Sequence, residues 1–219
     1  MNVVKYPWIL RIFHAVFAAC LLAQLAVGEL MDVPEVEGEH QEAMHILTQA
    51  FAHENEHLAE VGVTTPSLGF ETHEFLGLTI VGLLVFRMIL ALMALPEAGW
   101  RTLFPWLQAE GRTQLLQELN TQIKGWFRLE LANPQDSETT AKTMHGILLM
   151  LAAIMAVTGV LLYFGWSITA PQSWMVVLVA EVHEAIVGVL EAMIALHVLA
   201  AILHERQGHG VLARISPKP

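Results

Sequence analysis

Cysteine is almost absent from this chain of 219 residues, since Cys20 is the only one and lies within an apolar run. A single cysteine excludes an internal disulfide, a Cys-x-x-Cys-His haem attachment, an iron-sulfur ligand set and a zinc knuckle. Any metal must therefore be held by histidine, of which the chain has 11.

Charged residues are also scarce. They make up 15% of the chain against 55% hydrophobic residues, and the mean hydropathy is +0.53. This composition excludes an ordinary soluble domain and predicts a single membrane domain over residues 1–219. The formal net charge of -10 argues against nucleic acid as a partner. The apolar part of residues 1–30 is too long for a signal peptide and has no small-x-small cleavage site, which predicts a retained first span.

Four apolar runs are long enough to cross a bilayer as helices, for which about 20 residues are needed. We therefore expect an all-α fold, an integral membrane four-helix bundle. The predicted spans cover residues 8–30, 71–95, 144–166 and 174–203.

Positive charge predicts how the bundle is oriented. The connections after the first and third spans contain no lysine or arginine, whereas every basic residue except Arg87 lies at the N-terminus, in the second connection or in the tail. By the positive-inside rule both termini and the central connection are cytoplasmic.

Two connections are long enough to hold further structure. Residues 31–66, in the first outer connection, carry eight acidic residues and include an amphipathic pattern that predicts an extra helix. His53 and His57 in this pattern have metal-ligand spacing, but a solvated face of an acidic docking surface is the simpler interpretation. In the central inner connection, residues 105–131 predict a second amphipathic helix, lying at the membrane interface.

Residues 182–204, which include most of the fourth run, carry three histidines and two glutamates where lipid favours none. His183 and His197 are 14 residues apart, which places them within roughly 40° of one helix face and about 21 Å apart along the axis. His204 follows on the same face after seven more residues. No single metal can bind both His183 and His197.

The orientation groups four span histidines by depth. His14 and His197 lie at an inner level, and His73 and His183 lie at an outer level. Two facing pairs at two levels are what two non-covalent b-type haems require, because low-spin iron takes a neutral imidazole on each side of the macrocycle. Taken singly, each histidine has an alternative role in packing or in a proton path.

Two arginines are placed to meet the anionic haem propionates. Arg11 precedes His14 by three residues, and Arg87 follows His73 by 14, which puts it at the inner level. For Arg11 the alternative is an interaction with lipid phosphates.

These residues form a recognisable pattern: Arg11-Ile12-Phe13-His14, then His73 with Gly77 and Arg87, then His183 and His197 with thirteen residues between them. It resembles the superfamily of bacterial cytochrome b561 and the b-type cytochrome subunits of nickel-iron hydrogenases and formate dehydrogenases. The likeness covers all four spans. It implies that His14 and His197 ligate an inner haem and that His73 and His183 ligate an outer one, in agreement with the depth argument.

The resemblance also implies electron exchange with membrane quinone. We expect a bacterial inner-membrane protein that passes electrons between a periplasmic-side donor and quinone. His204, and more weakly His145, lie at the cytoplasmic edge, where an imidazole can hydrogen-bond a quinone carbonyl or deliver its proton. For both, the alternative is an interfacial histidine in contact with water.

Two other functions fit the same residues. One is a membrane anchor subunit for a periplasm-facing hydrogenase or dehydrogenase, with residues 31–66 as its docking surface. The other is a cofactor-free transporter in which the histidines form a proton path.

Overall fold

The computed structural model describes residues 5–31, 67–93, 99–134, 136–166 and 173–217, and these contain helices but no strand. Four of the helices are long and apolar enough to cross a membrane. They are α1 (Trp8–Leu30), α3 (Leu68–Leu92), α6 (Glu138–Gly165) and α7 (Trp174–Arg206). The predicted all-α class and its four spans are confirmed.

The span boundaries differ slightly from those predicted, and local capping accounts for two of the differences. Helix α3 begins three residues early because the Ser67 hydroxyl accepts a hydrogen bond from the Phe70 N–H (3.2 Å). Helix α6 begins six residues early because the Glu118 carboxylate accepts from the N–H groups of Thr139 (3.3 Å) and Thr140 (2.6 Å). Helix α7 continues three residues beyond its predicted end, and the predicted end of the second span falls outside the described residues.

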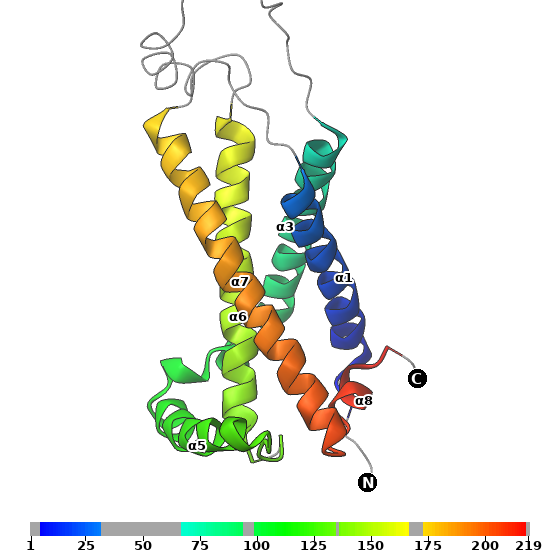
Figure 1. Ribbon diagram of the computed structural model, residues 1–219, viewed down its shortest axis with the longest axis vertical. Coiled ribbons are helices and arrows are strands. Elements are labelled where there is room, and N and C mark those ends of the chain that lie inside the picture. Colours follow the sequence, from blue (N-terminus) through cyan, green and yellow to red (C-terminus); the bar gives the residue numbers. More distant parts are fainter. Residues whose placement is uncertain (1–4, 32–66, 94–98, 135, 167–172, 218–219) are drawn as a thin grey trace, which may run out of the picture.

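One end of the bundle holds both described chain ends together with the short elements of the central connection (Figure 1). We call it the terminus end. The elements of the central connection are α4 (Trp100–Leu103), a 3-10 helix (Pro105–Leu107) and α5 (Ala109–Arg128), and the C-terminal tail adds α8 (Val211–Ile215). Among the described residues, every lysine and arginine except Arg87 lies in segments at this end. The opposite end holds Leu30, Leu68, Gly165 and Trp174.

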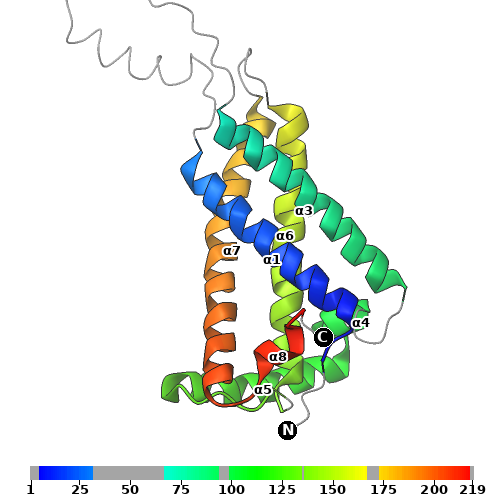
Figure 2. The ribbon, with the colours of Figure 1, turned by 90° about the vertical axis from the view of Figure 1, so that its right-hand side faces the viewer.

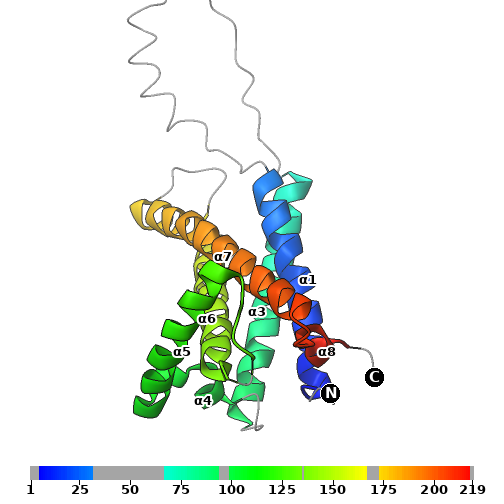
Figure 3. The ribbon, with the colours of Figure 1, turned by 60° about the horizontal axis from the view of Figure 1, so that its bottom comes forward.

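The long helices pack mainly as two pairs, α1 with α3 and α6 with α7. Figure 2 shows α1 and α3 crossing in front of the other two helices, and Figure 3 shows the two pairs from a tilted direction. Helix α3 also contacts α6, but α1 and α7 make little direct contact. Between them runs a largely apolar groove lined by Leu22, Leu25, Glu191, Ile194, Ala195, Val198, Leu199 and Ile202.

A small hydrophobic core lies in the middle of the bundle. Its buried members are Ile80 and Leu84 of α3 and Ala152 of α6. The side chains packed against it come from α1 and α6: Phe17, Cys20, Leu21, Leu149 and Ala156. On α7, Leu190 is 1% exposed and lies midway between His183 and His197. The core therefore separates two levels of the bundle, one toward each end.

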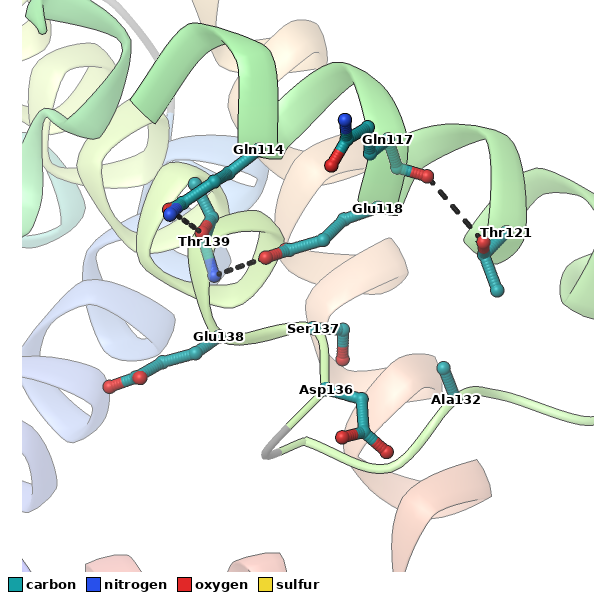
Figure 4. Close-up of a pocket in the computed structure, with 9 residues that line it drawn as sticks. All are labelled: Gln114, Gln117, Glu118, Thr121, Ala132, Asp136, Ser137, Glu138 and Thr139. Atoms are coloured by element: carbon teal, nitrogen blue, oxygen red, sulfur yellow. Dashed lines mark hydrogen bonds between the residues drawn. The ribbon is translucent and has the colours of Figure 1, made fainter. Parts of the chain in front are cut away.

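Helix α5 confirms the amphipathic helix predicted for the central connection. It lies across the terminus end (Figure 2) and directs polar side chains at the start of α6, where Glu118 caps the helix and lines an open polar pocket (Figure 4). Its apolar side chains Leu116, Ile123 and Phe127 are exposed, the last by 88%, as expected of a helix lying at a membrane interface. The helix predicted within residues 31–66, with His53 and His57, lies outside the described residues.

The C-terminal segment closes the terminus end between α7 and α1. The chain leaves α7 through Gly208 (φ 76°) and Gly210 (φ 62°), left-handed conformations that glycine adopts without strain. The Glu205 carboxylate then accepts from the Leu212 N–H (3.1 Å) at the start of α8. Beyond α8, the Ser216 carbonyl accepts a hydrogen bond from the Arg11 guanidinium (2.7 Å).

Candidate functional site

The level near the opposite end is built around two facing imidazoles. His73 of α3 and His183 of α7 have ring centroids 6.5 Å apart, with ring planes at 75°. Two imidazoles that each hold a shared metal at about 2 Å have centroids roughly 6 Å apart. The structure thus brings together two residues that the depth argument had paired, at a separation suited to one iron between them.

A glycine supports each of these imidazoles. A Cβ added at Gly28 of α1 would lie 3.2 Å from Cε1 and 3.4 Å from Nδ1 of His73. A Cβ added at Gly159 of α6 would lie 3.4 Å from Cε1 of His183. In each helix pair, one helix carries the histidine and its partner presents a glycine against the ring, so both imidazoles are laterally constrained.

The two Nδ1 atoms have different surroundings. Nδ1 of His183 is 2.7 Å from the hydroxyl of Thr158 on α6. Nδ1 of His73 is enclosed and makes no hydrogen bond of good geometry to any described residue, although the ring interacts with the main-chain carbonyl of Gln24 on α1. Both contacts come from the helix that packs beside the histidine's own helix.

The level near the terminus end contains three histidines instead of two. His145 of α6 and His197 of α7 are in ring contact, with centroids 5.1 Å apart and planes at 69°. His14 of α1 is close enough to interact electrostatically with both. The His145–His197 centroid separation is shorter than the roughly 6 Å expected of two imidazoles sharing an iron. His14 and His197 therefore remain the candidate ligands here, with His145 packed on one of them.

The candidate propionate arginines both lie toward the terminus end. Arg87 is 6% exposed, the most enclosed arginine among the described residues. Burying a guanidinium in a membrane helix is costly and calls for an anionic partner. Arg11 is half-buried and donates to the Ser216 carbonyl, so the C-terminal segment fixes its position.

His204 lies in the last turn of α7 and has a neighbour that the sequence analysis did not identify. Nδ1 of His204 is 2.9 Å from Nδ1 of His209, and the ring centroids are 5.2 Å apart. His145, the weaker quinone candidate, has His197 as its ring neighbour, so the structure places the two quinone candidates in different clusters. The glycines on either side of His209, both with positive φ, were the sequence signal for a turn back toward α7.

The donor chemistry and the packing at the level of His73 and His183 fit a haem. Neutral imidazoles are the axial ligands of b-type haems, and the lateral glycines would hold the two rings in place for a haem iron. Within the described part of the chain no group of three or more metal-ligating side chains is close enough to hold a bare metal ion. The facing His73–His183 pair is therefore a candidate for holding a haem iron.

Fold and site define a multi-pass membrane protein, all-helical where described, with histidines gathered at two levels. The family model for prokaryotic cytochrome b561 matches residues 5–218, and the chain belongs to that family. It is a membrane b-type cytochrome that acts in electron transfer. No curated protein and no solved structure gave a match.

Proposed function

We propose that this cytochrome binds two b-type haems and transfers electrons between a donor on the periplasmic side and quinone in a bacterial inner membrane. The observation that carries the proposal is the His73–His183 pair, with ring centroids 6.5 Å apart on helices of different pairs. The terminus end, which gathers the basic residues, is then the cytoplasmic end.

The chain's own residues hold the two cofactors apart. His73 and His183 are the ligands at the outer level, and His14 and His197 those at the inner level. The hydrophobic core between the levels excludes water and keeps the two sites in a medium of low polarity. Arg11 and Arg87 meet propionate charge at the inner level. When bound, each haem supplies a one-electron carrier whose potential the protein adjusts through ligands, hydrogen bonds and burial.

Quinone reacts at the cytoplasmic edge, beside His204. A hydrogen bond between two neutral Nδ1 atoms requires a proton on one of them and a lone pair on the other. When His209 donates, His204 carries its proton on Nε2 and can donate it to a quinone carbonyl oxygen. The Nδ1 proton of His209 then moves to Nδ1 of His204, and Nε2 of His209 takes a replacement from water. His209 is thus part of the same proton path.

Residues 31–66, rich in acidic side chains, are the docking surface for the periplasmic donor. An independent redox protein that binds transiently fits the proposal. The membrane-anchor alternative requires a permanent catalytic subunit there. Purification from the native membrane separates the two, because an anchor carries a stable partner with redox centres of its own.

The decisive experiment is a haem assay on the purified chain together with a dithionite-reduced minus oxidised spectrum. We expect a b-type alpha band and two haems per chain. One haem per chain would contradict the dihaem proposal, and His73→Ala and His14→Ala would show which level is filled. Reduction of added quinone by the reduced protein, or the reverse reaction, tests the substrate.

A further inference from the structure

Thr158 of α6 is a buried hydroxyl that stands between a helix backbone and a candidate ligand. It is 8% exposed, and its Oγ1 lies 2.7 Å from Nδ1 of His183 on α7. The same oxygen lies 3.0 Å from the Ile154 carbonyl and 3.1 Å from the Met155 carbonyl. Among the described residues, no other imidazole is hydrogen-bonded to a hydroxyl of a neighbouring helix.

The directions of these hydrogen bonds follow from the number of protons available. A hydroxyl has one proton to donate, whereas a carbonyl oxygen can only accept. Threonine in a helix donates that proton to the carbonyl three or four residues earlier, and both such carbonyls lie within reach here. When the hydroxyl donates to one of these carbonyls, it can only accept in its short contact with His183, and the donor in that contact is then Nδ1–H.

We infer that Thr158 is a positioning residue for the outer haem, fixing His183 in the tautomer that carries its proton on Nδ1 and leaves the Nε2 lone pair for iron. The inference rests on the proposed function, because it takes His183 as an axial ligand. A metal-bound histidine almost always donates its second ring N–H to an acceptor, which fixes the ring and raises its basicity. Thr158 supplies that acceptor, and Gly159, the next residue, gives the ring room to approach.

The outer site is asymmetric as a result. The His183 imidazole is fixed by a short hydrogen bond to a buried side chain, whereas the His73 ring interacts with the main-chain carbonyl of Gln24 without a hydrogen bond of good geometry at Nδ1. We expect the basicity of the His183 imidazole to be controlled from α6, through Thr158. A more basic imidazole favours the ferric state, so Thr158 holds the outer potential down.

The test compares three variants of the holoprotein. Thr158→Val keeps the side-chain shape and removes the acceptor, and Thr158→Ser restores it. Thr79→Val is the matched control, because the Thr79 hydroxyl of α3 also donates to the carbonyl four residues earlier (2.9 Å), and that carbonyl belongs to Phe75 of its own helix. Haem transfer to excess haem-free globin measures retention, and a potentiometric titration measures the two haem potentials. The outer component is the one missing from His73→Ala.

In Thr158→Val we expect the outer haem to be held about 10- to 100-fold more weakly, the usual effect of losing such a partner, and its potential to rise. The inner haem should be unchanged, and Thr158→Ser and Thr79→Val should behave as the wild type. If Thr158→Val fails to accumulate, Thr158→Ala should give the same result.

An unchanged outer potential and retention in both Thr158→Val and Thr158→Ala would overturn the inference, as would equal changes at both haems or in Thr79→Val. These outcomes leave the proposed function standing. If His73→Ala keeps every haem component of the wild-type protein, the proposed function is overturned, and the role of Thr158 with it.

Discussion

Gly28 on α1 and His73 on α3 approach so closely that a methyl group on the glycine would lie 3.2 Å from Cε1 of the imidazole. That distance is tighter than ordinary van der Waals contact, so the ring must move if a methyl group is added. Because His73 is a proposed ligand of the outer haem, the packing of two helices and the position of one ligand are directly linked.

Gly28→Ala should therefore disturb the outer haem selectively. Overpacking of this kind costs about 1 to 3 kcal/mol, which corresponds to roughly 5- to 150-fold weaker haem binding. Haem transfer to excess haem-free globin, followed by optical spectroscopy, measures this loss. The control is Gly82→Ala on α3, where an added Cβ meets nothing within 4 Å among the described residues. Equal haem retention in the two variants would show that the contact does not constrain His73.

The histidine pairs predict which haem each substitution removes. His73→Ala and His183→Ala should lose the same spectral component, and His14→Ala and His197→Ala the other. His145→Ala should keep both haems, because His145 contacts His197 at a centroid distance too short to hold an iron between them. Reduced minus oxidised spectra with a haem assay measure this. Loss of the inner haem in His145→Ala with retention in His14→Ala would reassign the inner ligand.

Much of this arrangement could be predicted from the sequence, because hydropathy and spacing report on single helices. Length and composition located the four spans, and the 14-residue step between His183 and His197 put two ligands at two depths of one helix. Matching depth across oriented helices then paired His73 with His183, which the structure brings into ring contact.

The contacts between helices could not be predicted in this way. Thr158, Gly28 and His145 act on residues of other helices, so their roles depend on helix rotation and neighbour order, which hydropathy does not encode. Glu118 caps a helix 20 residues further along the chain, and a mid-helix glutamate carries no local sign of that role. The position of His209 could have been predicted from the sequence, because the glycines on both sides of it indicate a turn.

Glu118→Ala should destabilise the protein without changing its spectrum. The carboxylate accepts hydrogen bonds from the Thr139 N–H (Figure 4), the Thr140 N–H and the Thr140 hydroxyl (2.9 Å) at the start of α6. Losing a helix cap costs about 0.5 to 2 kcal/mol, so thermal unfolding in detergent should begin at a lower temperature. Glu118→Gln, which keeps an acceptor oxygen, should be affected less. Gln117→Ala, an exposed neighbour on the same helix, is the control, and an equal loss there would argue against the cap.

The proposed orientation predicts which residues are accessible from each side of the membrane. In a Cys20→Ser background, Glu29→Cys at the opposite end of the bundle should react with an impermeant thiol reagent in intact spheroplasts. Gln117→Cys at the terminus end should react only after the membrane is opened. Both native side chains are exposed, so burial does not account for a difference. The reverse pattern would invert the topology and exchange the inner and outer haems.

The His204–His209 pair predicts how quinone receives its proton. His204→Leu should keep both haems with little spectral change, yet slow electron exchange with quinone at least roughly tenfold, because a positioned acid-base group contributes about that much or more. His209→Leu should also slow the exchange, by less, since water can protonate Nδ1 of His204 directly but without a fixed donor. Stopped-flow reduction of a quinone analogue measures both rates.

Arg206→Ala is the control, because Arg206 is an exposed basic residue of the same helical turn. A solvent deuterium effect on the wild-type rate that disappears in His204→Leu would tie the slow step to proton transfer at this imidazole. Wild-type kinetics in His204→Leu with both haems intact would exclude the residue. Wild-type kinetics in His209→Leu alone would leave His204 as the only proton donor. A quinone-site inhibitor found beside the outer haem would place the quinone site at the other face of the membrane.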